Sequence, residues 1–293
     1  MKILHVINSL SSGGAEKLVF EITKKMSSKD VQIEVLTLTS KKDVYTDELR
    51  KLGFVVHTLS SSKSIYNVFV ITFLLIRFFR SHSYDLVHVH PFPSFYYISI
   101  LKRYKFIKCS VFFHEHNTTN NRMEKAYFKR IDEFMYQPYK KIICISPAVK
   151  DALLGHYLIS EKKLVVINNG IDLSICKESK PIDRNNINPT ISAKDILLIM
   201  VARFNKQKDH VTLLKAMKLL AEEYKLILLG EGETENEIKC LSDSLGLQNR
   251  VFFLGYKKMS MITLRPLIYL FCHLFLKDLV LYVWKQWLVV FLQ

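Results

Sequence analysis

Two cations five residues apart are the most informative chemical feature of the sequence. Arg203 follows an apolar run, and Lys208 stands just before a helical pattern in "VARFNKQKDHVTLLKA". A guanidinium offers a planar fork of donors and an ammonium offers a point charge, and both suit a diphosphate held at the end of a strand. The alternative interpretation is a pair of solvated loop cations.

Glycines follow two of the predicted strands. Gly13 and Gly14 come after "KILHVI" and open a helix, whose free N–H groups can hold an anion. Because the pattern is not GxGxxG, a plain strand-to-helix turn is the alternative there. Gly230 and Gly232, in "LILLGEGE", would let a backbone approach a ligand closely.

Histidines mark the ends of two further predicted strands. His114 and His116 lie on one side if the strand through "VFFHEHN" persists, whereas a bend would separate them. An imidazole at the carboxyl edge of a parallel sheet can serve a substrate hydroxyl as hydrogen-bond partner or acid–base group. A metal is disfavoured because spacing marks no third ligand beside these histidines and Glu115. His88 and His90, in "LVHVHP", are interpreted as structural residues at a strand end.

The elements that must position these residues alternate between strands and helices. Short apolar runs and helical patterns alternate through residues 1–172, which predicts a mostly parallel, doubly wound sheet. The polar stretch 173–194 carries two prolines and no periodicity, as a linker does. The alternation restarts at residue 195, with a predicted helix over 209–224. The sequence therefore predicts an α/β chain with two Rossmann-like domains, 1–172 and 195–257.

Composition restricts the partners and the compartment. Lys and Arg number 42 against 27 acidic residues, a net charge of +15, which favours nucleic acid, anionic membrane or phosphate-bearing ligands. No basic patch interleaved with aromatic residues supports nucleic acid, so no such partner is expected. Five cysteines without metal or redox spacing indicate a reducing compartment. The apolar, basic-ended segment 64–82 predicts either a helix packed on the sheet or one in peripheral contact with a membrane.

The order of the motifs resembles the family 4 glycosyltransferases over about residues 1–257. The motifs that carry the resemblance are "GGAEKL", "HEHN", "ICISPAVKDAL", "VINNGID", "VARFNKQKDHVTLLKA", "LILLGEGE" and "VFFLGY". The resemblance implies a retaining enzyme with two facing Rossmann-like domains, the arrangement called GT-B. It also implies an N-terminal acceptor domain, with Gly13 and Gly14 near the cleft and His116 as the active-site histidine.

The resemblance further implies how the donor is held. Arg203 and Lys208 would bind the diphosphate of a nucleotide sugar, with Gly230 and Gly232 in the same donor site. No metal and no other cofactor are expected, because the cations would stabilise the departing nucleoside diphosphate. The implied reaction moves a hexosyl or N-acetylhexosaminyl group to a saccharide or lipid-linked acceptor in surface polysaccharide synthesis. The expected location is the cytoplasm, with peripheral contact at the inner face of the membrane.

The sequence departs from the family pattern after residue 257. The resemblance implies a later acidic motif, E-G-F-G-x-x-x-x-E-A, but residues 258–293 contain no glycine and a single acid, Asp278. Lys277 and Asp278 divide the apolar run into pieces shorter than the roughly 20 residues of a spanning helix. A buried helix pair and a shifted reading frame are the two interpretations left.

The genetic code favours a frameshift near residues 257–258. Read one frame over, the junction of Trp284 and Lys285 must encode Glu, and the junctions from Leu276 to Val280 permit E-G-F-G at the family spacing. We hypothesise that 258–293 is an aberrant apolar tail and that the second domain is truncated. Transfer is then expected to be impaired; the alternative is a noncatalytic remnant that binds acceptor or nucleotide without turnover.

Overall fold

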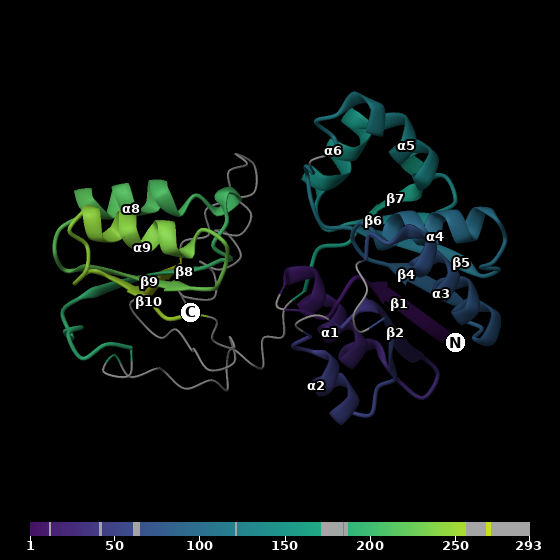
Figure 1. Cartoon of the computed structure of the whole chain (residues 1–293), viewed down its shortest axis with the longest axis horizontal. Coiled ribbons are helices and arrows are strands. Elements are labelled where there is room, and N and C mark those ends of the chain that lie inside the picture. The colour runs from purple at the N-terminus through teal and green to yellow at the C-terminus, as the bar shows by residue number, and fades with distance from the viewer. Residues whose placement is uncertain are drawn as a thin grey trace. The chain divides into compact units, whose positions relative to one another are not determined.

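The chain divides into two compact units, Met1–Gly170 and Ile171–Gln293. The computed structural model describes residues 1–11, 13–40, 43–60, 65–120, 122–170, 184, 187–255 and 268–270 (Figure 1). The predicted linker 173–194 and the predicted tail 258–293 therefore lie largely outside the described residues.

A seven-stranded sheet forms the centre of the first unit, in the order β3-β2-β1-β4-β5-β6-β7, and all its neighbouring pairs are parallel. Its strands read as short apolar runs because both faces are covered. They are β1 Lys2–Ile7, β2 Gln32–Thr39, β3 Val56–Ser60, β4 Leu86–Val89, β5 Ser110–Glu115, β6 Lys141–Cys144 and β7 Leu164–Val166.

Helices cover both faces of this sheet, as Figure 1 shows. They are α1 Gly14–Met26, α2 Thr46–Lys51, α3 Val68–Ser81, α4 Ser94–Arg103, α5 Ala126–Tyr136 and α6 Pro147–His156, with a 3₁₀ turn η1 at Glu161–Lys163. One apolar core joins Leu4 and Val6 of β1 to α3, α4, α5 and α6. A second core joins Ile7 of β1 to α1 and α2 on the opposite face. Alternate residues of β1 thus belong to different cores.

The described part of the second unit holds a four-stranded parallel sheet in the order β10-β9-β8-β11. The strands are β8 Ile196–Val201, β9 Tyr224–Leu229, β10 Val251–Phe253 and β11 Ile268–Leu270. The helices α8 His210–Leu219 and α9 Glu235–Ser244 pack on one face of it, through Leu214, Met217 and Ile238. On the other face, Ile191 packs against Leu197 and Ile227. The predicted class, α/β with Rossmann-like parallel sheets, is confirmed.

The predicted helix over 209–224 is too long, because α8 ends at Leu219 and β9 begins at Tyr224. The buried Arg250 explains the early end: its guanidinium donates hydrogen bonds to the carbonyls of Leu220, Ala221 and Tyr224. A single cation thereby holds together the short segment between α8 and β9 through three of its carbonyls.

The helix α3 has one packed face and one exposed face. Ile71, Leu75 and Phe78 are buried in the core, whereas Phe69 is 89% exposed and Phe73 is 64% exposed. Across the described residues, no helix is both long enough and apolar enough to cross a bilayer.

Candidate functional site

Strand register gathers five histidines on one face of the first sheet. His5 of β1 is the register partner of His88 of β4, and His88 is the partner of Phe112 of β5. Register partners in a parallel sheet project to the same face, and so do residues two apart along a strand. His90, His114 and His116 therefore join His5 and His88, on the face that also carries Ile7 and α1.

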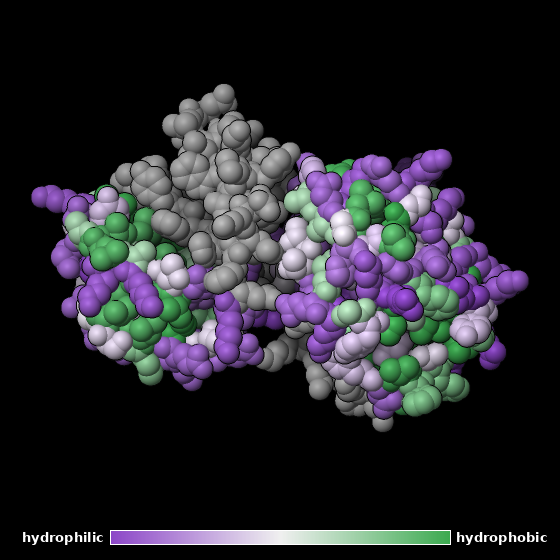
Figure 2. All heavy atoms as spheres, turned by 90° about the horizontal axis from the view of Figure 1, so that it is seen from above, coloured by the Kyte–Doolittle hydropathy of each residue, from purple (hydrophilic) through white to green (hydrophobic). Residues whose placement is uncertain are grey.

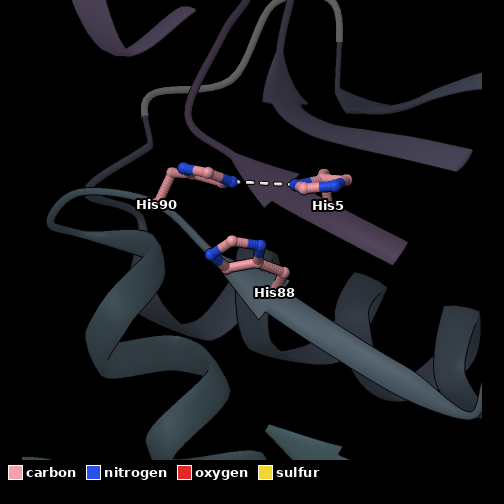
Figure 3. Close-up of side chains that lie close together, drawn as sticks. All are labelled: His5, His88 and His90. Carbon is pink, nitrogen blue, oxygen red and sulfur yellow. Dashed lines mark hydrogen bonds between the residues drawn. The ribbon is translucent and has the colours of Figure 1, made fainter. Parts of the chain in front are cut away.

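The five imidazoles are in contact with one another. The Nδ1 atom of His5 and the Nε2 atom of His90 lie 2.9 Å apart, and Figure 3 shows this bond with His88 beneath the pair. The rings of His88 and His114 are stacked with centroids 5.3 Å apart, and those of His114 and His116 with centroids 4.5 Å apart. The alternation thus continues past the end of β5, and the bend considered for this position is absent.

Burial keeps these rings neutral. It lowers the pKa of His5 to about 3 and that of His116 to about 4, because a charged imidazolium is poorly solvated there. Burial, assisted by the neighbouring imidazoles, also lowers the pKa of His114 to about 2 and holds the pKa values of His88 and His90 far below the ordinary value. Neutral imidazoles present lone pairs as well as N–H groups, so the cluster can accept a proton or ligate a metal.

Glu115 lies on the other side of the strand. One oxygen of its buried carboxylate accepts hydrogen bonds from the backbone N–H groups of His116 and Asn117, and the other accepts from the hydroxyl of Tyr136. Burial raises the pKa of this carboxyl group. Glu115 therefore stabilises the backbone at the end of β5, next to His116, and its carboxylate does not join the imidazole rings of the histidine cluster.

Gly13 and Gly14 lie at the same carboxyl edge as His116. Gly13 is the N-cap residue of α1, and a Cβ there would come within 2.0 Å of the Glu16 carboxylate, which folds over this end of the helix. The Glu16 carboxylate thus lies beside the backbone N–H groups that the sequence proposed as an anion site. Asn8 fixes the turn by donating to the carbonyl of Phe92 and accepting from Ser94.

In the second unit, Arg203 follows the carboxyl end of β8 and its side chain is exposed. Lys208 ends the 3₁₀ turn η3 Lys206–Lys208, and the left-handed Asp209 then caps α8 through the N–H of Thr212. Among the described residues, neither cation has a hydrogen-bond or ion-pair partner. Two cations without partners at a strand's carboxyl end are suited to bind an anion.

Gly230 and Gly232 serve the loop that carries Arg203. A Cβ on Gly230 would lie 2.0 Å from the carbonyl oxygen of Ala202, and one on Gly232 would lie 2.1 Å from that of Phe204. The N–H of Phe204 also donates to the carbonyl of Glu231. The close approach that the glycines permit is therefore one between two loops of the chain, whereas the sequence suggested an approach to a ligand.

Sequence reasoning missed His5 and assigned His88 and His90 only a structural part. The signal that was available is the H-x-H pattern, which begins in both β4 and β5, ends one residue beyond each strand and directs each pair to one face. His5 gives no such signal, because only the register with His88 brings it into the cluster.

Two family models match the chain. The one described as Glycosyltransferase Family 4 matches residues 12–175, more than half of the 293 residues, and includes Gly13, Gly14 and His116. The one described as Glycosyl transferases group 1 matches residues 182–274 and includes Arg203 and Lys208.

Curated relatives and solved structures align with most of the chain. A putative glycosyltransferase EpsF of Bacillus subtilis is 26% identical, over 87% of this chain and 68% of that protein. The N-acetylgalactosamine-N,N'-diacetylbacillosaminyl-diphospho-undecaprenol 4-alpha-N-acetylgalactosaminyltransferase of Campylobacter jejuni is 28% identical, over 85% of this chain and 68% of that protein. The crystal structure of Anabaena HepE with UDP and glucose aligns with a TM-score of 0.72 at 19% identity, over 88% of this chain and 70% of that one. The likeness to HepE confirms the predicted fold class across both units.

Proposed function

Because the chain belongs to glycosyltransferase family 4, we propose that it moves a sugar from a nucleotide-diphosphate donor to a saccharide or lipid-linked acceptor. The observation that carries the proposal is the position of Arg203 and Lys208 at the carboxyl end of β8, where neither side chain has a partner in the part of the chain that the structure describes. Charge on a departing diphosphate needs stabilisation that is already in place, and fixed cations supply it.

The loop architecture supports donor binding at this end of β8. Gly230 and Gly232 let the loop after β9 lie against the Ala202–Phe204 backbone, so the loop that carries Arg203 is held in a defined position. A cation on a loop whose backbone is already held loses less conformational freedom when it binds a phosphate. In this proposal the two cations carry the charge and the transfer step uses no metal.

His116 is the proposed acid–base group on the acceptor side. Its lowered pKa, about 4, leaves the ring neutral at physiological pH, so a ring nitrogen can accept a proton or a hydrogen bond from an acceptor hydroxyl. Gly13 and Gly14 are proposed to line the cleft beside it.

The relatives support the substrate class. The name of the Campylobacter enzyme specifies a diphospho-undecaprenol acceptor, and HepE was crystallised with UDP and glucose. We therefore propose a lipid-linked or saccharide acceptor of surface polysaccharide synthesis and a hexosyl or N-acetylhexosaminyl donor.

Calorimetric titration of the full chain with UDP tests the donor site. We expect heat of binding from the wild type and at least about tenfold weaker binding after Arg203→Ala, since a charge-assisted pair to phosphate is lost. Lys215→Ala, which removes an exposed cation of α8, is the matched control and is expected to bind normally. Equal binding by all three proteins would reject the donor site.

The exposed face of α3 supports peripheral contact with an anionic membrane. Phe69 and Phe73 lie one turn apart, and the exposed Arg77 and Arg80 follow on the same face. Arg80 also lies over the ring of Phe106, at 5.9 Å from its centroid. In Figure 2, hydrophobic residues reach the surface of this unit among hydrophilic ones. Apolar insertion combined with basic side chains is the physical basis of interfacial binding.

Liposome flotation tests the membrane contact. We expect the chain to float with vesicles that contain anionic lipid, and the double variant Phe69→Ser/Phe73→Ser to float several-fold less because the inserting side chains are lost. The exposed pair Tyr127→Ser/Leu158→Ser provides the control, since it lies away from α3. Flotation that is independent of anionic lipid would contradict the proposal.

Whether the second unit contains a complete donor site decides between an active enzyme and a noncatalytic remnant. The acidic motif that the family resemblance implies is missing from residues 258–293, so we propose that donor binding survives while transfer is impaired. A noncatalytic remnant that binds acceptor or nucleotide without turnover is the second candidate, and the same missing motif favours it.

A further inference from the structure

The histidine cluster contains ring nitrogens that nothing in the described part of the chain satisfies. They are Nε2 of His88, Nδ1 of His90, both nitrogens of His114 and Nε2 of His116. A buried polar atom without a partner costs free energy. Five such nitrogens in one place therefore need a physical explanation.

Two overlapping triads within the cluster have the spacing of a metal site. One ring nitrogen each of His90, His114 and His116 lie within 4.8 Å of one another, and the same holds for His5, His88 and His90. Zinc–imidazole bonds of about 2.0–2.1 Å in a tetrahedral site require nitrogens about 3.4 Å apart, so small side-chain movements suffice.

The hydrogen bond between His5 and His90 distinguishes the triads. It occupies Nδ1 of His5 and Nε2 of His90, and it leaves Nδ1 of His90 without a partner in the described structure. A ligating histidine usually donates its other ring N–H to a neighbour, which fixes its tautomer and orientation. His90 can therefore ligate through Nδ1 while His5 accepts from its Nε2–H group.

We propose that His90, His114 and His116 bind one transition-metal ion of the zinc class, with His5 as the residue that positions His90. The donors are imidazole nitrogens, and the neighbouring carboxylate of Glu115 lies on the opposite face of the sheet. Imidazole donors select Zn²⁺, Cu²⁺ or Ni²⁺, whereas Mg²⁺ and Ca²⁺ require oxygen ligands.

Three histidines leave a coordination position open, and His116 is the most accessible of the three. The site would lie at the carboxyl edge of the first sheet, and its three ligands all belong to the first unit. The expectation that the donor site needs no metal is unaffected. Metal on His116 would also occupy the nitrogen that we assign to acid–base work, so zinc is expected to slow any transfer activity.

The test uses the untagged full chain, stripped with a chelator and titrated with Zn²⁺ against a chromophoric competitor. We expect one ion per chain, and at least about 100-fold weaker binding after His114→Gln or His116→Gln, since removal of a ligand costs more than the 10–100-fold of an outer-shell change. His57→Gln, which removes a histidine outside the cluster, is the control and is expected to bind normally.

Cobalt gives a second readout, and its first measurement uses only the wild-type chain. Co²⁺ added to the wild-type chain is expected to give the intense visible bands of a four- or five-coordinate imidazole site, and His116→Gln is expected to remove them. Weak octahedral bands alone would overturn the proposal. So would zinc binding that survives His116→Gln and is lost in His88→Gln, because the ion would then belong to the other triad.

Discussion

At the scale of single residues, Glu34 shows how a few hydrogen bonds determine the charge state of a carboxyl group. Its carboxylate accepts from Lys2 Nζ at 2.7 Å, from the Tyr84 hydroxyl at 2.7 Å and from His57 Nε2 at 2.8 Å. Burial alone would raise its pKa, but the bonds from Lys2, Tyr84 and His57 outweigh it and lower the pKa to about 2. The carboxylate thereby ties β2 to the start of β1, to β3 and to the segment before β4.

Replacement of Glu34 by Gln is expected to destabilise the first unit in a pH-dependent way. A carboxyl group whose folded pKa is lowered stabilises the fold above its unfolded pKa of 4.5, and this contribution is lost as the pH falls toward 2. We expect a loss of about 1–2 kcal/mol in the free energy of unfolding at pH 7, after allowance for partial solvent screening, and less than half of that at pH 3. Urea unfolding at both pH values measures it.

The exposed Glu124 offers a matched control for this change. Glu124→Gln is expected to leave the free energy of unfolding nearly unchanged at pH 7. A cost for Glu34→Gln that is the same at pH 7 and pH 3 would contradict the assignment.

Residue types and spacing predicted one part of the histidine cluster but not the rest. His114 and His116 follow from strand alternation, since a period of two is a local property. His88 and His90 share a face by the same alternation, but His5 could not be added from the sequence, because its proximity to His88 depends on the register between β1 and β4. Similarly, position 230 requires glycine because a Cβ there would collide with the carbonyl of Ala202, which belongs to another loop.

At the scale of elements, Arg250 determines where α8 ends. It is 5% exposed and donates to carbonyls at Leu220, Ala221 and Tyr224, between α8 and β9. The apolar periodicity over 209–224 contains no stop signal, so the sequence predicts a longer helix. The stop comes from a residue that is distant in the sequence and becomes adjacent only in the folded unit.

Replacement of Arg250 by Met is therefore expected to loosen the junction between α8 and β9. Three carbonyls lose a charged donor, which costs about 2–4 kcal/mol in the second unit. Hydrogen exchange of the β9 amides is expected to accelerate accordingly. Lys218→Met removes an exposed cation of α8 and is the control; equal exchange in both variants would show that Arg250 does not fix this junction.

The order of strands and helices was predictable because each element has a local pattern. Parallel strands that are buried on both faces read as short apolar runs, and the helices between them show a 3.6-residue period. The face that α3 presents to the core could not be read from the sequence, because apolar residues occur around most of that helix. Packing then buries Ile71, Leu75 and Phe78 and leaves Phe69 and Phe73 exposed.

At the scale of the whole molecule, each unit carries its own apolar cores. Two clusters lie within residues 4–166 and two within residues 187–254. The sequence predicted this division from the polar stretch 173–194, where hydrophobic periodicity stops. A change that affects only the end of the second unit is therefore expected to leave the first unit folded.

The reading frame after residue 257 provides the last prediction. If the frame has shifted, the nucleotide sequence across codons 255–293 will spell E-G-F-G followed by E-A in the neighbouring frame. A chain translated from the restored frame is expected to release nucleoside diphosphate from UDP- or GDP-linked sugars at least about 100-fold faster than the present chain. That factor is typical when a group that stabilises the transition state is regained.

Two comparisons make the frame experiment decisive. Arg203→Ala in the restored chain is expected to abolish the gain, because the acidic motif and the two cations are proposed to act on the same donor. Unfolding of the first unit is expected to be unchanged between the two chains, since its cores lie within residues 4–166. A neighbouring frame that lacks the acidic motif, or equal turnover by the present and restored chains, would reject the frameshift.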